Sequence, residues 1–447
     1  MSTHAKLSPS GASQWMNCPG SVALQLGLPD SRSEYADEGT AAHFLAEQCL
    51  TNKVDAMHYH GHVIRVTPKG ETYFKQGLTL ETDNTFNVDE EMCEAVQTYV
   101  DAIRDYSSGE GDLAFFENRV NFSDVIGVPD SFGTSDAIII TGDYKEIQVH
   151  DLKYGRGVRV DAMKVIADGV SIPNKQMALY ALGALEEHGL CGDFERVRLV
   201  IHQPRLGHIS ECVFRLSDLQ AFAVVARQSA QIAIVEADAY EIDGDASKLT
   251  LNAGADQCQW CKVKATCPAL NKHVMDTVIG DFDDVSGDER PASVAEAITQ
   301  AIAEVPFLEP DDLAVKRDAL DLIEMWSKAV AAKVSADLHQ GLAVGHYKLV
   351  AGRKGARAWH DPDEAEKLMK SMRLKQDQMY TFKVISPTAA EKLKKEGGIG
   401  ARQWPKLESM IVQKEGQPVV VDGADKRPAI VIAAVADDFA DESGDLT

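Results

Sequence analysis

Two carboxylates and one ammonium group lie on neighbouring segments that resemble β-strands. Asp136 follows Gly133 by three residues and leads into an apolar run. Asp151 and Lys153 stand two apart at the end of the next apolar run, so their side chains share one face of that strand. An adjacent strand can bring Asp136 beside them. Carboxylates hold Mg²⁺ or Mn²⁺, which activates a bound water, and a lysine stabilises a charged phosphate. This trio is typical of phosphodiester hydrolysis, although an Asp-x-Lys triplet alone is also compatible with a surface ion pair.

A second cluster consists of the thiols of Cys258, Cys261 and Cys267, which lie within ten residues. Two cysteines separated by two residues can bind one metal centre from a tight turn, and the third supplies most of a site. The fourth ligand is not local. Cys18 is the candidate because it precedes Pro19, just as Cys267 precedes Pro268. The spacing fits zinc and iron–sulfur equally. The remaining cysteines lie in apolar runs and are expected in the core: Cys49, Cys93, Cys191 and Cys212.

The composition narrows the classes of protein. The chain has 447 residues, 45% of them apolar and 26% charged, and a net charge of −24. This is a globular composition with enough residues for two or three domains, and the acidic balance argues against nonspecific coating of nucleic acid. No apolar run reaches the roughly 20 residues that cross a bilayer, and the N-terminus lacks the apolar core of a signal peptide. We therefore expect a cytoplasmic protein without a membrane segment.

Hydrophobic periodicity places the first cluster in a sheet flanked by helices. Helical spacing covers residues 8–50 and the segment from Met92 to Ile103. Between about 110 and 240 the pattern predicts three strands, a helix, two strands and a long helix. The predicted elements are Leu113–Val120, Thr134–Thr141, Ile147–Leu152, Asn174–His188, Arg196–His202, Ile209–Phe214 and Leu216–Ala239. Residues 51–87 have no assignable pattern.

The charge distribution changes after Cys267. Residues 276–312 contain 11 acidic residues and one basic residue, whereas residues 341–407 carry 14 Lys and Arg against 7 Asp and Glu. A long helix is expected at Asp311–Leu338. We therefore divide the chain into a catalytic domain at 1–270, an acidic linker at 271–312, a helical and basic α+β lobe at 313–430, and an acidic disordered tail at 431–447.

Together these motifs resemble the RecB-type branch of the PD-(D/E)xK nucleases, namely the iron–sulfur members such as AddB and the CRISPR-associated RecB-like exonucleases. The resemblance covers about residues 8–270. It includes the early Glu38-Gly39-x-x-x-His43 segment, the Gly133-x-x-Asp136 and Asp151-x-Lys153 motifs, and the Gln176-x-x-x-Tyr180 helix. An added C-terminal lobe is similar to proteins from phages and prophages, which suggests phage DNA recombination or processing in a bacterial cytoplasm.

The resemblance implies an α/β fold: a mixed PD-(D/E)xK restriction-endonuclease-like sheet flanked by helices, with an added α+β C-terminal lobe. It implies a metal-dependent DNA exonuclease that acts on single strands or duplex ends. The implied catalytic residues are Asp136, Asp151, Lys153, Gln176 and Tyr180. The implied Mg²⁺ or Mn²⁺ ligands are His43, Asp136, Asp151 and Leu152. Cys18, Cys258, Cys261 and Cys267 would hold a [4Fe–4S] cluster. The alternatives are a non-catalytic, zinc-containing DNA-binding or recombination scaffold, and an endonuclease of the same fold.

The basic lobe is a candidate DNA-binding surface. Cations and an aromatic ring alternate in one short segment, as a backbone-contacting and base-stacking surface requires. Its candidate residues are Arg353, Lys354, Arg357, Trp359 and Arg402. The same surface could instead dock on the acidic linker or tail, or bind a protein partner. A recombination protein such as a single-strand annealing protein, and a further copy of this chain, are the partners we consider.

Overall fold

The computed structural model describes residues 6–28, 33–75, 83–165, 170–279 and 309–348, together with residues 299, 303, 305–307, 391–392, 394–395, 397, 400, 402 and 404–408. The chain divides into two compact units, Met1–Val350 and Ala351–Thr447, which are described separately. Within the described ranges, no helix is long and apolar enough to cross a membrane. The finer division at residues 270, 312 and 430 stays a prediction.

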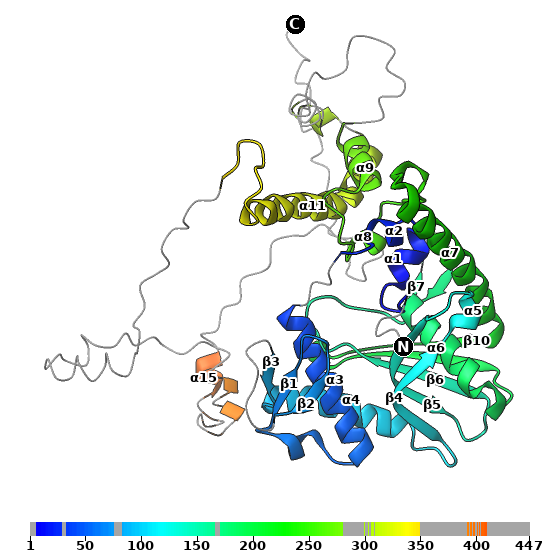
Figure 1. Ribbon diagram of the computed structural model, residues 1–447. Helices are drawn as coiled ribbons and strands as arrows, with labels where there is room; N and C mark the ends of the chain where they lie inside the picture. The colour runs from blue at the N-terminus through cyan, green and yellow to red at the C-terminus, as the bar shows by residue number, and fades with distance from the viewer. Residues whose placement is uncertain are drawn as a thin grey trace, which may run out of the picture. The chain divides into compact units, whose positions relative to one another are not determined.

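A five-stranded mixed sheet forms the centre of the first unit (Figure 1). Its strands follow the order β10-β9-β6-β5-β4, and only β6 and β9 are parallel. A parallel pair needs a crossover, which here contains helix α6 (Lys175–His188). The strands are β4 (Leu113–Asn121), β5 (Phe132–Ile140), β6 (Glu146–Leu152), β9 (Arg196–Gln203) and β10 (His208–Arg215). The predicted order of strands and helices is confirmed, with α7 (Leu216–Asp243) as the last helix.

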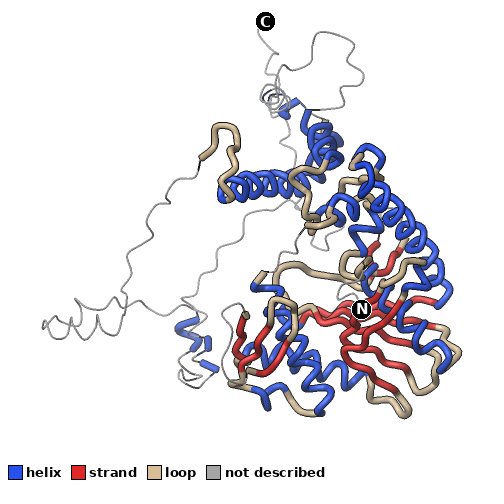
Figure 2. The backbone as a smooth tube through the Cα atoms, viewed as in Figure 1, coloured by secondary structure: helices blue, strands red, loops and turns tan. Residues whose placement is uncertain are grey.

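Helices cover both faces of this sheet, as Figure 2 shows by colour. On one face, Ile138 and Val149 pack with α1 (Ala12–Asn17), α6 and α7. On the other, Ile139 and Leu152 pack with α3 (Glu34–Asn52) and α4 (Glu90–Tyr106). Every residue of β6 is buried, as expected for a central strand covered on both sides. The site residues on this strand are therefore fixed by two cores.

Short strands account for the segments that the sequence left unassigned. Residues 63–87 contain a three-stranded antiparallel sheet of β1 (Val63–Val66), β2 (Thr72–Phe74) and β3 (Asn84–Asn87). A hairpin of β7 (Met163–Val165) and β8 (Ser171–Pro173) is inserted between β6 and α6. Strands of three or four residues, most of them partly exposed, are too short for an alternating pattern.

The C-terminal part of the first unit consists of helices. α9 (Pro268–Ile279) packs against α11 (Pro310–His339), so the helix predicted at 311–338 is confirmed. Leu270 and Val274 of α9 share a buried cluster with Cys258, Cys267 and other side chains of this region. The remaining described elements are short: α2 (Ser21–Leu24), α5 (Ser123–Ile126), α8 (Ala255–Cys258), α15 (Trp404–Glu408), η1 (Ala56–Tyr59), η2 (Gly189–Cys191), η3 (Pro204–Leu206), η4 (Ala246–Lys248) and η6 (Val305–Phe307).

The close approach of α6 to β4 yields a stability prediction. A Cβ added at Gly183 would lie 2.9 Å from the Cβ of Val120. We predict that Gly183→Ala lowers the free energy of unfolding by about 1–3 kcal/mol, because the helix must shift to relieve overpacking. Urea denaturation measures the change. The control is Gly39→Ala on α3, where an added Cβ meets nothing within 4 Å. Equal or greater stability of Gly183→Ala would contradict this packing.

Candidate active site

Three carboxylates lie in one row across neighbouring strands. The register pairs Ala137 of β5 with His150 of β6, so the next positions, Asp136 and Asp151, face each other. On the other side of β5, the register of β4 aligns Glu117 with Asp136. Three negative charges in adjacent positions repel one another unless cations lie between them. The row therefore defines the point where positive charge is required.

Helix α3 supplies an imidazole to this row. His43 Nδ1 lies 3.0 Å from Asp136 Oδ1, and the other carboxylate oxygen of Asp136 accepts the backbone N–H of Leu152 at 2.6 Å. The ligand atoms of His43, Glu117 and Asp136 all lie within 4.8 Å of one another. One nitrogen and two carboxylate oxygens at this separation fit a divalent cation. Leu152 has a buried apolar side chain, so only its backbone carbonyl could serve as the predicted ligand.

The Asp-x-Lys motif meets helix α6 at the same place. Lys153 Nζ lies 2.9 Å from Asp151 Oδ2 and 3.1 Å from Gln176 Oε1. Gln176 Nε2 in turn lies 3.1 Å from the hydroxyl of Tyr180 and 3.4 Å from Asp151 Oδ1. Asp151 Oδ2 is buried and makes no hydrogen bond among the described residues, although it pairs with the Lys153 ammonium. The structure thus brings the predicted catalytic residues together.

A close backbone approach explains the glycine of the Gly-x-x-Asp motif. A Cβ at Gly133 would lie 2.6 Å from Cε1 of Tyr180 and 2.7 Å from Cγ of Pro9. Only glycine therefore lets β5 pass beneath the Tyr180 ring. Since Tyr180 contacts Gln176, which contacts Lys153, this glycine helps to set the position of the lysine.

Glu117 is a site residue that the sequence analysis missed. It lies in the predicted strand Leu113–Val120, where an acidic residue followed by Asn118 and Arg119 resembles an ordinary solvent-facing position. Its φ of 45° falls in the left-handed region, which is rare for a residue within a strand and costs about 1–3 kcal/mol. The register is unchanged on either side of it, so no residue is inserted. The one available signal was its position in the strand preceding the Gly-x-x-Asp strand.

The pKa values follow from crowding three carboxylates around two cations. Burial lowers the pKa of His43, but the facing Asp136 carboxylate outweighs this and raises it to about 9. Burial and the nearby Asp136 raise the pKa of Glu117 to about 8. Burial also favours the neutral form of Asp136, yet His43 and the Leu152 N–H hold its pKa below the usual range. Burial raises the pKa of Asp151 despite Lys153.

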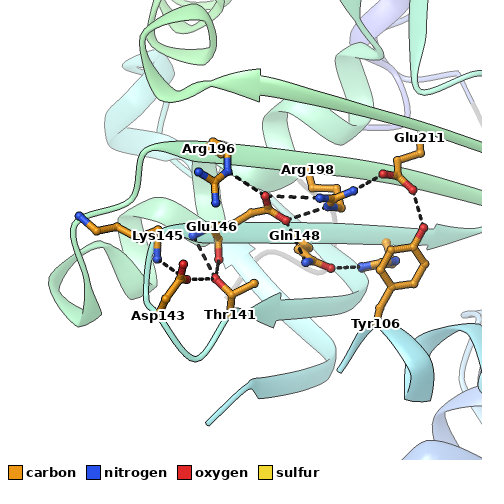
Figure 3. A network of polar contacts seen from close by, with 10 residues as sticks. Tyr106, Thr141, Asp143, Lys145, Glu146, Gln148, Arg196, Arg198 and Glu211 are labelled. Atoms are coloured by element: carbon orange, nitrogen blue, oxygen red, sulfur yellow. Dashed lines mark hydrogen bonds and ion pairs between the residues drawn. The ribbon is translucent and has the colours of Figure 1, made fainter. Parts of the chain in front are cut away.

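The face of β6 that points away from Asp151 carries a second polar network (Figure 3). Glu146 accepts hydrogen bonds from Arg198 Nε at 2.7 Å, Arg196 Nε at 3.1 Å and Gln148 Nε2 at 3.0 Å. Further along, His150 contacts Gln148 at 3.2 Å and His202 at 3.1 Å.

The two histidines at the end of this network are buried and neutral. Burial holds the pKa of His150 well below its usual value and lowers that of His202 to about 4. The carbonyl of His202 accepts the backbone N–H of Lys153 at 2.8 Å. The network therefore fixes the strand pair from which Asp151 and Lys153 project.

The four cysteines predicted as cluster ligands come together in the first unit. Cys18 ends α1, Cys258 ends α8, and all four thiols are buried and free. Burial raises the pKa values of Cys18 and Cys258, and of Cys261 to about 11; the neighbouring thiols of the group raise them further. The backbone N–H of Asn252 donates to Cys18 Sγ at 3.3 Å. Cys49, Cys93 and Cys212 lie in the cores, as expected, whereas Cys191 is exposed.

Most of the predicted basic surface falls outside the described residues, namely Arg353, Lys354, Arg357 and Trp359. Arg402 of the second unit is described and exposed. Two positions further on, Trp404 is buried, with Lys394 Nζ 4.6 Å from the centre of its ring. DNA binding by this segment stays a prediction.

The raised pKa values predict that cation binding displaces protons. Near neutral pH, His43 (pKa about 9) and Glu117 (pKa about 8) both hold protons, which a metal ion must replace. We expect Mn²⁺ binding to release between one and two protons at neutral pH, and almost none above about pH 10. Isothermal titration calorimetry in buffers of different ionisation enthalpy measures this number. Glu117→Gln should lower the release by about one proton. Metal binding without proton release at neutral pH would refute the assignment of these ligands.

Comparison with known proteins adds a family. A crystal structure of a protein from Eubacterium rectale, described as a "Putative exonuclease", matches with 12% identity and a TM-score of 0.27, over 56% of this chain and 90% of that chain. This TM-score is lower than the values found for two chains that share a fold. The likeness therefore assigns neither a fold nor an activity to this chain. A family model described as "Protein of unknown function (DUF2800)" matches residues 4–428. Since this match spans nearly the whole chain, the protein belongs to the DUF2800 family.

Proposed function

We propose that this protein is a divalent-metal-dependent deoxyribonuclease of the PD-(D/E)xK type. The observation that carries the proposal is the row of Glu117, Asp136 and Asp151, with His43 on one side and Lys153 on the other. Five ionisable side chains from α3, β4, β5 and the end of β6 converge on one point, where Asp151 is buried and the other four are partly buried. Buried groups with displaced pKa values at such a point are characteristic of catalytic sites.

The donor set suits Mg²⁺ or Mn²⁺. Both ions favour carboxylate oxygens, and an imidazole is acceptable to Mn²⁺. Asp136 and Asp151 would hold the ion, with His43 and Glu117 completing the protein side of the shell. Asp151 Oδ2 is buried and accepts no hydrogen bond among the described residues, and its partner in this structure is the Lys153 ammonium at 2.9 Å. When bound, the metal supplies an activated water and neutralises charge on the phosphate.

The side chains around the carboxylates orient the reacting groups. The Lys153 ammonium carries the positive charge that stabilises the phosphate as negative charge builds up on it. Gln176 accepts a hydrogen bond from Lys153 and contacts Tyr180, so α6 fixes where that ammonium lies. Burial alone would lower the pKa of Lys153, but the neighbouring Asp151 carboxylate raises it. The ion pair with Asp151 therefore keeps Lys153 protonated.

DNA as substrate and removal of nucleotides from ends are supported by the sequence resemblance. The motifs of His43, Asp136, Asp151 and Gln176 occur in the order found in the iron–sulfur exonucleases of this type. A role in phage recombination rests on the similarity of a nuclease with an added C-terminal lobe to phage and prophage proteins, and has no support among the described residues. An endonuclease of the same fold would use the same site, and it would cut an end-blocked strand that an exonuclease leaves intact.

We further propose that Cys18, Cys258, Cys261 and Cys267 hold a [4Fe–4S] cluster that links α1 to α8 and α9. The four buried thiols influence one another's pKa, which supports one shared metal centre. The sequence resemblance favours a [4Fe–4S] cluster over zinc at this centre.

The catalytic proposal predicts the effect of three substitutions. Asp136→Ala, Asp151→Ala and Lys153→Ala should each lower the cleavage rate by about 10²–10³-fold or more, because each removes part of one electrostatic unit. The triple variant should be scarcely slower than Asp151→Ala, since members of one unit are non-additive. Single-turnover cleavage of end-labelled DNA in Mg²⁺ measures the rates. Asp101→Ala, an exposed position on α4, is the control. Near-normal cleavage by Asp151→Ala would sink the proposal.

The cluster proposal predicts iron content and stability. Anaerobic purification should yield about four iron and four sulfide ions per chain, as four thiolate ligands of a cubane require. Cys18→Ala should lose most of the iron and lower the Tm by roughly 5–10 °C, because a link between distant segments is lost. Cys191→Ala and Cys93→Ala should keep both. Stoichiometric zinc with no iron would favour the zinc alternative.

A further inference from the structure

A groove of about 820 Å³ lies beside the candidate active site and has no role in the mechanism above. Its walls come from the end of α1, the β7–β8 hairpin, the start of α6, β10 and the first half of α7. The lining is mainly apolar and includes Met16, Met163, Phe214 and Phe222, with Lys175 and Asp218 as its charged residues. Its volume falls in the range of sites for small organic groups.

The groove and the candidate active site share the start of α6. Pro173 and Lys175 line the groove, and the next residue, Gln176, contacts both Asp151 and Lys153. A polymer bound at the scissile position therefore has its neighbouring unit close to the groove. If a ligand in the groove is joined to a phosphate, its binding would help to position that phosphate at the candidate active site.

One cation of the groove lacks an anionic partner. Among the described residues, no carboxylate lies within ion-pairing distance of Lys175, whose ammonium contacts the amide oxygen of Asn17. Asp256, whose negative charge acts on Lys175, is itself paired with Lys164 at 2.6 Å, and Asp218 also lines the groove. The backbone N–H groups at the start of α6 are already taken by the Asn174 side chain. Lys175 is thus the group available for an incoming phosphate.

The apolar walls suit the flat face of a base. Phe214 and Phe222 are half-buried and line the groove with the flexible side chains of Met16 and Met163. Bases stack on aromatic side chains whatever their sequence, at about 1–3 kcal/mol per base. In a duplex these faces are covered by the neighbouring base pairs, so only an unpaired base can enter. The lining therefore selects a single strand.

We propose that this groove binds an unpaired nucleobase of a single-stranded end, with the adjoining phosphate on Lys175. The proposal rests on the proposed nuclease function and adds its substrate class: the strand is single-stranded next to the cleaved bond. A protein segment is a poorer occupant because the groove shares the start of α6 with the proposed phosphate-cleaving site and because Lys175 has no carboxylate partner among the described residues.

Filling the groove tests the proposal. Ala221 is exposed and lines the groove, so Ala221→Trp should fill it without disturbing the core. The matched control is Ala239→Trp, an exposed position on the same helix outside the groove. Fluorescence anisotropy of a short single strand, with the full chain carrying Asp151→Asn to keep the strand intact, gives the Kd. We expect Ala221→Trp to raise the Kd about tenfold or more, and Ala239→Trp to leave it unchanged.

An abasic oligonucleotide separates the base from the backbone. It should bind the parent chain about tenfold more weakly than the normal strand, and Ala221→Trp should then have no further effect. Lys175→Gln should weaken both strands and flatten the plot of log affinity against log salt by about 0.7. Val225→Glu, a second exposed substitution in the groove, should repeat the loss seen with Ala221→Trp.

The outcomes distinguish this proposal from the nuclease proposal. Binding is measured without cleavage, so the two proposals can fail separately. If the wild-type chain cuts DNA but Ala221→Trp and Val225→Glu do not weaken binding, the proposal of a base-binding groove is wrong and the nuclease proposal stands. Equal binding of normal and abasic strands also overturns it. Base-dependent binding by a wild-type chain that never cuts DNA overturns the nuclease and keeps the groove as a nucleic-acid site.

Discussion

The carboxylate of Asp136 is the contact on which the rest of the site depends. One oxygen faces the imidazole of His43, and the other accepts the backbone N–H of Leu152. A single side chain thus joins α3, β5 and β6, which belong to two cores on opposite faces of the sheet. It also stands between Glu117 and Asp151, so its negative charge raises the pKa of both carboxyl groups. A site built this way is stable only when positive charge is supplied, by protons in the free protein and, under the proposed function, by a divalent cation.

The strand that carries the Asp-x-Lys motif is held from behind by polar contacts. Glu146 and two arginines anchor its start, and the buried pair of His150 and His202 lies directly behind its end. Charged and polar groups are expensive to bury unless each finds a partner, and this network supplies partners along the face of β6. Because these contacts are directional, they fix the register of β6 on β9 more strictly than apolar packing would. Burying these polar groups costs free energy, and what the network achieves is the fixed position of Asp151 and Lys153.

The sequence was sufficient to predict the strands of the central sheet. It was also sufficient to place Asp151 and Lys153 on one face at the end of β6. Long apolar runs with clear turn residues define β4 to β6, and strand periodicity puts Asp151 and Lys153 on one face. Glu117 was not predictable in the same way, because its role depends on a left-handed φ and on cross-strand register. Short strands such as β1 and β7 were missed because three or four residues carry too little periodicity. The groove was missed because it joins segments more than 200 residues apart, from Met16 to Val225.

The most direct test of the central claim is metal rescue at the cleaved phosphate. A single-stranded substrate with sulfur in place of one nonbridging oxygen is compared with the normal strand under single-turnover conditions. Mg²⁺ strongly prefers oxygen ligands, whereas the softer Mn²⁺ tolerates sulfur. If a metal held by Asp136 and Asp151 contacts this phosphate, one sulfur isomer is cut about tenfold or more slowly in Mg²⁺, and Mn²⁺ restores the rate. Equal rates for both strands in both metals, or undiminished cleavage in EDTA, would contradict a metal-dependent nuclease.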